Sequence, residues 1–386
     1  MNIETVKGFK DFTGEDAKIR EEVRKILVDT FEQYGFEPAE TPVIEYEEFV
    51  RGENVNDEAV SDIYKLIDKG NRKLALRYEF TFQLKRLMIG KKLPYKRYCI
   101  GPVFRDEPTT GNRFRQFVQC DIDTVGSTVK EEAEVLAVVN RVLTNLGIDF
   151  VIYINNKKLL NEILEGENIE KMNWENVIKE IDKMDKIDKK IIYNNLKQYN
   201  AENLIEVFEK PIEFFKKYES YKEIEELIKY CDYYGININF LPSLARGLSY
   251  YNGSIYEIKT KEMKESITGG GSFMFNGIQS TGISFGLDRL SKLAKIENKK
   301  EEIMIISIAQ DEQAINISES LRKIGKDIIF SSEKISKALD YANAKKIEKV
   351  MIIGEDEIKK KKVKIKDMKS GNEKFVSIKD LIKKLK

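Results

Sequence analysis

Charged, amide and aromatic side chains alternate with apolar ones along one short stretch of this sequence, residues 114–126. Phe117, Gln119 and Asp123 are separated by even numbers of residues, so in a β-strand their side chains share one face. An arginine can fork onto a phosphate, an aromatic ring can stack on a nucleobase, and a carboxylate can hold an ammonium group. The mixture suits a zwitterionic ligand that carries phosphate. A solvated sheet face would show the same alternation.

Two neighbouring segments repeat this mixture of charges. If residues 73–82 form a strand, Glu79 and Thr81 lie on one of its faces. A strand that ends at Arg105 has Glu107 just beyond its end. Three charged strand faces together favour the floor of a binding site over three unrelated surface strands.

Two strings near a glycine cluster add cations and rings. Residues 244–251 read LARGLSYY, and residues 285–290 read FGLDRL, with an arginine in the first turn of an expected helix. The cluster at 269–271 is either a turn or a phosphate cradle, and it lacks the spacing of a P-loop. Each string alone is weak evidence for a site.

The composition excludes several reaction classes. The 386 residues include no histidine, which removes Ser-His-Asp hydrolases, Cys-His proteases and histidine-ligated metal sites. The 3 cysteines are scattered without a CxxC pair, so neither a zinc ribbon nor a disulfide framework is predicted. The 66 Lys and Arg residues balance 65 Asp and Glu residues, and the sequence has no leader-like start and no long apolar run. We therefore expect a protein of the reducing cytoplasm without a membrane partner.

Strands and helices must position these side chains. Apolar spacing and a following glycine predict helices at 16–34 and 130–146. Helical periodicity with almost no glycine at about 157–235 predicts an inserted helical subdomain. The expected strands of the larger part are 62–68, 73–82, an antiparallel pair at 96–105 and 114–126, 149–154, 237–240, 250–259 and 281–285.

The last part of the chain has a different pattern. Short apolar segments alternate with helical ones after residue 302, which predicts a small, mostly parallel α/β domain. Seven lysines crowd into 359–369. They are either a solvated strand-and-turn surface or a contact for a phosphate backbone. The expected strands are 303–308, 326–330 and 349–354, and the expected helices are 311–324 and 334–346.

Taken in order, these strings resemble the histidyl-tRNA synthetases, a family of class II aminoacyl-tRNA synthetases. The string LARGLSYYNGSIYE (244–257) matches a signature particular to histidyl enzymes, and the resemblance covers nearly the whole length. The other matching strings are KGFKDF (7–12) for the N-terminal KGxxDF signature, YGF to TP (34–42) for class motif 1, FRDE (104–107) with Arg113 and the strand that follows for motif 2, and GLDRL (286–290) for motif 3.

The resemblance implies an α+β fold: a class II antiparallel sheet flanked by helices, with a helical insertion and a C-terminal α/β anticodon-binding domain. It also implies a homodimer. The expected boundaries are 1–155 for the N-terminal part of the catalytic domain, 156–236 for the insertion, 237–298 for the rest of the catalytic domain and 302–386 for the anticodon-binding domain.

The family's reaction joins histidine and ATP, accompanied by Mg²⁺, into histidyl-adenylate and then transfers the histidyl group to tRNA(His). By resemblance, Arg105 contacts the α-phosphate and the substrate carboxylate, and Arg246 has a transition-state role near the α-phosphate. Phe117 stacks on adenine and Arg289 binds the γ-phosphate. The implied ATP-binding set is Arg105, Glu107, Arg113, Phe117 and Arg289.

The resemblance also implies a histidine pocket. Glu79, Thr81 and Gln119 hold the α-ammonium group, while Asp123 and Tyr251 hold the imidazole. A carboxylate that accepts from a ring N–H can reject apolar side chains of similar size, because such an analogue leaves it unpaired. The implied histidine-binding set is Glu79, Phe80, Thr81, Arg105, Gln119, Asp123, Arg246, Tyr250 and Tyr251.

The sequence departs from the family pattern at two places. Ser249 stands where the family usually has aspartate, and Ser272, Phe273 and Met274 replace the usual Arg-Tyr-Asp.

One alternative is a non-catalytic paralogue similar to the regulatory subunit of ATP phosphoribosyltransferase, which generally lacks the anticodon domain and the RGLxYY string. Another is an RNA-binding module with a decayed site, but that reading predicts the loss of Arg105, Glu107 or Arg289, and all three are present.

Overall fold

The chain divides into two compact units, Met1–Ile296 and Glu297–Lys386, and each is described by itself. The structure is a computed structural model. It describes residues 3–52, 60, 62–111, 113–184, 187–245, 250–296, 302–378 and 380. None of the helices within these ranges combines the length and apolarity that a bilayer crossing requires.

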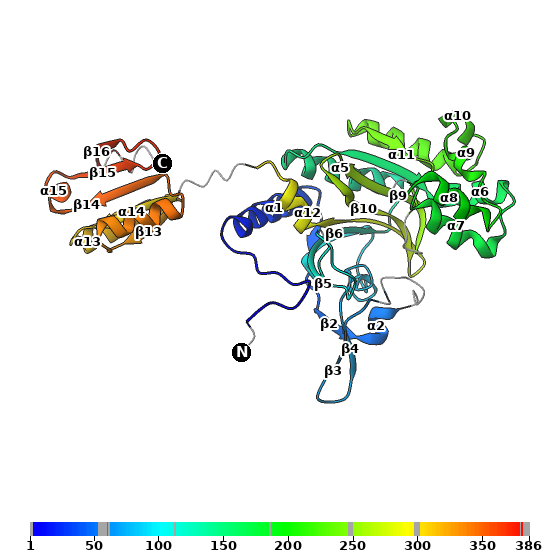
Figure 1. Cartoon of the computed structure of the whole chain (residues 1–386), viewed down its shortest axis with the longest axis horizontal. Coiled ribbons are helices and arrows are strands. Elements are labelled where there is room, and N and C mark those ends of the chain that lie inside the picture. Colours follow the sequence, from blue (N-terminus) through cyan, green and yellow to red (C-terminus); the bar gives the residue numbers. More distant parts are fainter. Residues whose placement is uncertain are drawn as a thin grey trace. The chain divides into compact units, whose positions relative to one another are not determined.

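A large, mostly antiparallel sheet forms the centre of the first unit (Figure 1). Among the described strands of this sheet, only the outer pairs β1–β5 and β7–β8 are parallel. In spatial order the strands are β1 (Glu37–Pro38), β5 (Tyr95–Phe104), β6 (Gln116–Val125), β11 (Ile278–Gly286), β10 (Met263–Phe275), β9 (Tyr251–Thr260), β7 (Val151–Asn156) and β8 (Ile238–Phe240).

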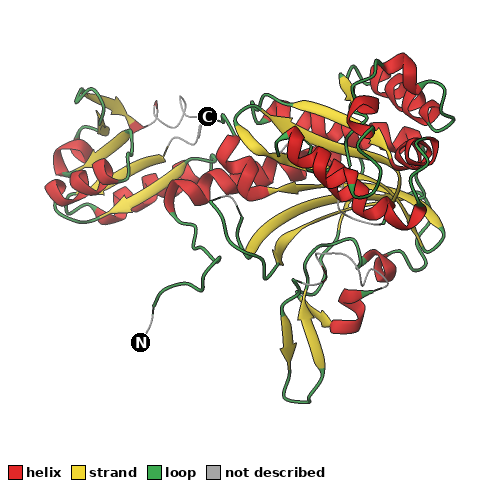
Figure 2. Ribbon diagram, turned by 45° about the vertical axis from the view of Figure 1, so that its right-hand side comes forward, coloured by secondary structure: helices red, strands yellow, loops and turns green. Residues whose placement is uncertain are grey.

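The two faces of the central strands differ in character. Cys120 and Ile122 of β6 and Phe285 of β11 are buried in the main apolar core, and Phe285 lies 5.8 Å from Phe31, centroid to centroid. The opposite face carries the polar side chains of β6, as the alternation predicted. Helices packed along the sheet can be followed in Figure 2. Those that contribute to this core include α1 (Gly14–Gln33), α5 (Val129–Asn145) and α12 (Leu287–Leu293).

A smaller sheet has the strand order β2–β4–β3. The expected strand 73–82 is wrong beyond Leu76, because the chain leaves the sheet there. Arg77 turns inward, where its Nε donates to the carbonyl of Pro102 at 2.8 Å and its Nη1 to that of Thr41 at 2.7 Å. The elements here are β2 (Ile44–Tyr46), α2 (Glu47–Arg51), β3 (Lys65–Ile67), β4 (Lys73–Leu76) and α4 (Leu84–Leu87).

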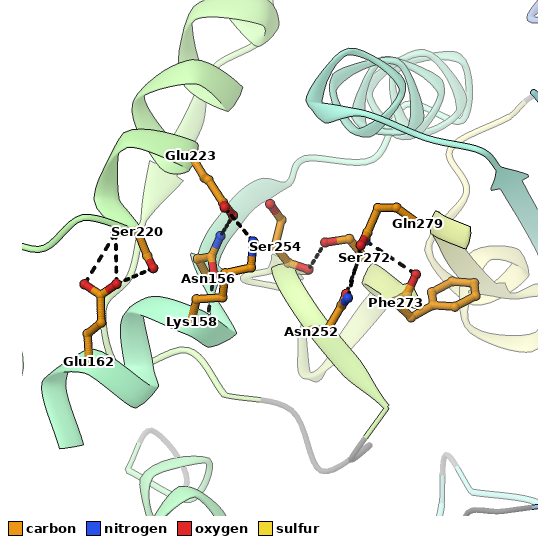
Figure 3. Close-up of polar contacts among 10 residues, drawn as sticks. All are labelled: Asn156, Lys158, Glu162, Ser220, Glu223, Asn252, Ser254, Ser272, Phe273 and Gln279. Carbon is orange, nitrogen blue, oxygen red and sulfur yellow. Dashed lines mark hydrogen bonds and ion pairs between the residues drawn. The ribbon is translucent and has the colours of Figure 1, made fainter. Parts of the chain in front are cut away.

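The segment between β7 and β8 is helical, as its periodicity predicted. Its apolar side chains join the same buried cluster as the large sheet, so it has no separate core among the described residues. Polar contacts tie its ends together: Asn156 and Lys158 both donate to Glu223, and Ser220 donates to Glu162 (Figure 3). The helices are α6 (Lys157–Gly166), η1 (Lys171–Asn173), α7 (Trp174–Ile181), α8 (Lys189–Lys197), α9 (Leu204–Phe208), α10 (Ile212–Phe215) and α11 (Tyr221–Tyr233).

The second unit is an α/β domain with the strand order β13–β12–β14–β15–β16. The first three strands are parallel, as expected, and the last two pair antiparallel. Lys359 ends a short helix, and the rest of the lysine-rich stretch forms β15 and its flanking turns, where Lys364 pairs with Glu373 at 3.0 Å. The elements are β12 (Glu302–Ser307), α13 (Asp311–Arg322), β13 (Asp327–Ser331), α14 (Ile335–Ala344), β14 (Lys349–Ile353), α15 (Glu355–Lys359), β15 (Lys362–Asp367) and β16 (Glu373–Ser377).

Candidate active site

A pocket of about 460 Å³ lies on the polar face of β6, β10 and β11. It brings together residues from sequence segments more than 200 positions apart, from Glu79 to Arg289. Of the thirteen site residues expected from the sequence, the following line it: Glu79, Thr81, Arg105, Glu107, Arg113, Phe117, Gln119, Asp123, Tyr250, Tyr251 and Arg289.

Two expected residues are not among them. Phe80 packs in a small apolar cluster with Cys99 and Val103 and is not among the residues that line the pocket, so its place in the histidine-binding set stays a prediction. The chain around it is a turn, not a strand, and the Arg77 guanidinium lies 4.6 Å from the ring centroid. Arg246 lies outside the described residues, as does Ser249.

Three arginines gather at one end of the pocket. Burial lowers the pKa of Arg289, and the positive charges of Arg113 and Arg105 lower it further. The carboxylates of Glu265 and Glu107 oppose this shift. The three positive charges repel one another, and an anion bound between them would offset this repulsion. The cluster therefore suits a polyphosphate.

Phe117 supplies a ring beside this cluster. The Arg105 guanidinium lies 5.3 Å from its ring centroid, and Arg105 Nε donates to the carbonyl of Tyr78 at 3.2 Å. Arg113 pairs with Glu107 at 3.1 Å in the loop between β5 and β6. A purine could stack on Phe117 while its phosphates meet the arginines.

Asp288 fixes the start of α12 relative to β6. Its Oδ2 accepts from the backbone N–H of Val118 at 3.1 Å, and its Oδ1 pairs with Arg20 of α1 at 2.8 Å. The next residue, Arg289, donates from Nη1 to the carbonyl of Ser266 at 2.7 Å. Motif 3 thus holds its arginine by contacts to one helix and two strands.

The N-terminal signature crosses the start of β6. The carbonyl of Gly8 accepts from the backbone N–H groups of Arg115 and Gln116 at 2.9 and 3.2 Å. Gly8 has φ of +87°, and an added Cβ would lie 2.7 Å from Arg115 Cγ, so glycine is required for this close approach. The N-terminal signature thus supplies a backbone acceptor at the start of β6, the strand that carries motif 2.

Asp123 occupies the other end of the pocket, beside a buried arginine. Its Oδ2 lies 2.6 Å from Nη2 of Arg97, which is fully buried and also donates to the carbonyl of Phe80 at 3.0 Å. Burial raises the pKa of Asp123 above its ordinary value, and the Arg97 charge opposes that rise. Gly282 lies opposite Asp123, and a Cβ there would lie 2.1 Å from Asp123 Oδ1.

Aromatic rings form a wall next to Asp123. The ring of Tyr250 lies 4.7 Å from that of Tyr251 and 5.7 Å from that of Phe273, centroid to centroid. The glycine cluster is not a turn, because it lies inside β10, and Gly269 and Gly270 line the pocket. Gly271 leaves room for a ring there: an added Cβ would lie 2.8 Å from Tyr251 Cδ1 and 2.5 Å from the carbonyl of Ser254.

Ser272 points to the opposite side of β10. Its hydroxyl donates to the carbonyl of Ser254 at 3.3 Å (Figure 3). The buried Glu132 carboxyl is also within its reach. Gln279 donates to the carbonyl of Phe273 at 3.4 Å. The departure at Ser272 therefore lies behind the pocket wall, and only Phe273 of the changed string faces the pocket.

Sequence reasoning assigned no role to three polar residues in or beside this pocket, although the alternation of 114–126 puts Asp121 on the same face as Gln119 and Asp123. Asp121 lines the pocket between Gln119 and Asp123, and Ser284 lies directly opposite Asp121 on β11. Burial and the charge of Asp123 raise the pKa of Asp121 to about 7. The third is Arg97. The only sequence signal for Arg97 was a charged residue in an otherwise mostly apolar strand, on the same face of that strand as Cys99.

No cluster of three or more acidic or cysteine side chains suited to a resident metal ion occurs within the described part of the chain.

Comparison with known proteins identifies two domain families in the chain. A family model described as histidyl-tRNA synthetase matches residues 8–290, and one described as anticodon binding domain matches residues 302–386. Together they account for both structural units.

Full-length relatives carry the same description. The chain is 35% identical to histidine–tRNA ligase 1 of Bacillus cereus over 99% of both chains, and 31% identical to histidine–tRNA ligase of Wolinella succinogenes over 96% and 95%. A histidyl-tRNA synthetase crystal structure from Nostoc sp. PCC 7120 superposes with a TM-score of 0.87 at 25% identity, covering 100% and 99% of the two chains.

The regulatory type of relative is also similar in fold. A Bacillus halodurans structure described as an ATP phosphoribosyltransferase regulatory subunit/histidyl-tRNA synthetase has a TM-score of 0.75 at 19% identity, covering 88% of this chain and 96% of that chain. At this identity the likeness concerns the fold alone.

Proposed function

The chain belongs to the histidyl-tRNA synthetase family, and on that premise we propose how its pocket performs the family's reaction, the ATP-dependent joining of histidine to tRNA(His). The observation that carries the proposal is the pocket itself. It places three arginines and an aromatic ring at one end and a buried carboxylate with two tyrosines at the other.

The first step needs no general base, because the carboxylate of histidine is already ionised at neutral pH. That carboxylate attacks the α-phosphate of ATP, and pyrophosphate leaves. Arg105 neutralises charge on the α-phosphate and orients the attacking carboxylate, while Arg113 and Arg289 hold the outer phosphates. Arg246 shares the transition-state role by resemblance, and Phe117 stacks on adenine.

Histidine is recognised at the other end of the pocket. Asp123 accepts a hydrogen bond from the imidazole, with Tyr251 at the ring and Tyr250 beside it. Glu79, Thr81 and Gln119 hold the α-ammonium group. Support comes from the burial of Asp123, because an amino acid with an apolar side chain would leave this desolvated carboxylate without the imidazole N–H.

We propose that Mg²⁺ enters with ATP rather than as a resident metal. The acidic pocket residues can each supply one carboxylate, and Mg²⁺ is commonly held by one or two carboxylates together with substrate phosphates. Glu107 lies next to the arginine cluster, so it fits such a role.

The partners follow from the family. We propose that the second unit contacts the anticodon of tRNA(His), with the lysines of β15 on its surface, and that the protein acts as a homodimer in the cytoplasm. The division into a catalytic domain (1–155 and 237–298), an insertion (156–236) and an anticodon-binding domain (302–386) is part of this proposal. The match of residues 302–386 to an anticodon binding domain disfavours the regulatory paralogue, which generally lacks one.

The decisive experiment is histidine-dependent exchange of pyrophosphate into ATP, with the other amino acids as controls. Exchange with histidine alone is expected. The absence of exchange from a folded protein that still binds histidine would instead favour the regulatory paralogue, and charging of tRNA(His) then tests the second step.

Removal of the Phe117 ring is expected to weaken ATP binding selectively. In Phe117→Leu, which keeps apolar bulk but has no flat face, we expect KM for ATP to rise about tenfold, in line with the free energy of stacking one base on an aromatic side chain. KM for histidine should change little. Pyrophosphate exchange at varied ATP checks this, and an equal rise in both KM values would contradict the stacking role.

A further inference from the structure

Three polar side chains form a continuous chain of hydrogen bonds across β6 and β11. Gln119 Nε2 donates to Ser284 Oγ at 2.7 Å, and Ser284 Oγ donates to Asp121 Oδ1 at 2.6 Å. All three residues line the pocket. The remaining amide atom, Gln119 Oε1, is buried and has no hydrogen-bond partner among the described residues.

The direction of this chain follows from the chemistry of its last member. An ionised carboxylate only accepts hydrogen bonds, so the single hydroxyl proton of Ser284 goes to Asp121. Ser284 Oγ can then only accept from Gln119, which turns the NH₂ of the amide toward β11. The amide carbonyl oxygen is left without a partner in the part of the chain that the structure describes. The negative charge of Asp121 thus selects one of the two amide orientations.

We propose that Asp121 and Ser284 are positioning residues that orient the amide of Gln119 so that its carbonyl oxygen accepts from the α-ammonium group of histidine. The inference rests on the proposed function and assigns a role to two residues that the family resemblance left without one. An ammonium group is a donor only, so a reversed amide would present donors to a donor. The buried, unpartnered Oε1 is the atom that such a substrate would satisfy.

The surroundings of Asp121 make this orientation depend on pH. Asp121 is 5% exposed. Burial and Asp123 raise its pKa to about 7, while Arg97, the Ser284 hydroxyl and Arg105 oppose the rise; Cys99 and Arg77 also face it. A protonated Asp121 can donate to Ser284, whose own proton is then free for Gln119 Oε1. Affinity for the ammonium group should therefore fall as the pH drops through this range.

The test uses two histidine analogues that differ at the proposed contact. Histidinol keeps the ammonium group, whereas 3-(imidazol-4-yl)propionate lacks it and keeps the ring and the carboxylate. In Asp121→Asn, which removes the charge with little change of shape, we expect histidinol affinity to fall about tenfold, since a hydrogen bond to a charged group is lost. Affinity for the propionate should be unchanged, as should kcat in pyrophosphate exchange.

Two further variants complete the experiment. Ser284→Ala breaks the chain of hydrogen bonds and should weaken histidinol binding. The affinity for histidinol should then depend on pH only through the titration of the ligand's own imidazole. In a Gln119→Ala background, Asp121→Asn should have no additional effect, because the residue through which it acts is gone. Additive effects of the two substitutions would overturn the proposal.

The outcomes also separate this inference from its premise. Wild-type protein that binds neither histidine nor histidinol would refute the proposed function and the inference with it. Normal binding to wild type, with equal losses of histidinol and the propionate in Asp121→Asn, would refute only the positioning role. Thermal unfolding shows that each variant is folded, and Asp121→Asn should be no less stable than wild type because it removes a buried charge.

Discussion

Replacement of Arg97 by methionine is expected to raise KM for histidine by about 10- to 100-fold, although Arg97 does not line the pocket. The fully buried guanidinium supplies the positive charge 2.6 Å from Asp123 Oδ2. Without it, burial would raise the pKa of Asp123 further, which favours the protonated carboxyl. A protonated Asp123 is a poorer acceptor for the imidazole N–H. Pyrophosphate exchange at varied histidine measures the change.

The same substitution should lower the free energy of unfolding by about 3–5 kcal/mol, the usual cost of leaving one member of a buried ion pair unpaired. The loss should depend on pH. A carboxyl whose pKa is raised in the folded state contributes stability below its unfolded pKa, and this is lost as the pH rises through the folded pKa. Arg97→Met should therefore cost little at pH values where Asp123 is protonated and most at alkaline pH.

A second substitution provides the control. Adding Asp123→Asn to Arg97→Met removes the uncompensated charge, so stability should largely return while histidine binding stays weak. If Arg97→Met lost stability but kept the wild-type KM for histidine, Asp123 would not be the imidazole acceptor.

The partner of Asp123 could have been found from the sequence with one additional piece of information. The strand pair 96–105 and 114–126 was predicted correctly because its polar and apolar residues alternate. That information is the register of the strand pair, in which Phe104 lies opposite Gln116. Counting seven residues back along β5 and seven forward along β6 then places Arg97 opposite Asp123. The sequence pattern predicted the strands but not this register, so a charge in a mostly apolar strand had no assigned partner.

Other features depend on contacts between distant segments. Ser284 faces Asp121 only because β11 pairs with β6, more than 150 residues away in sequence. The glycines 269–271 were expected in a loop, since glycine is unusual inside strands. Their place in β10 follows from the close approach of Tyr251 and of the carbonyls of Ser254 and Gly282. Local patterns predicted most elements and the family resemblance implied most pocket residues, while polar partners across strands required the tertiary structure.

Replacement of Arg105 is expected to have the largest effect on the first step. Arg105→Met should lower kcat for pyrophosphate exchange by about 10³-fold, the upper range for loss of one oriented donor to a charge that develops in the transition state. Arg105→Lys should recover only part of this, because an ammonium group keeps the charge but cannot fork between the α-phosphate and the attacking carboxylate. Stability should change little, since Arg105 is only half-buried.

Arg115 offers a matched control for this experiment. It lies directly before β6 and does not line the pocket. Its side chain pairs with Asp106 at 3.2 Å and donates to the carbonyl of Glu107 at 3.2 Å. Arg115→Met therefore removes the same charge from the same region without removing a side chain that lines the pocket. If the two substitutions lowered kcat equally, the effect of Arg105 would arise from the general electrostatic field of motif 2. A loss confined to Arg105→Met, with histidine still bound, would place the guanidinium at the reacting phosphate.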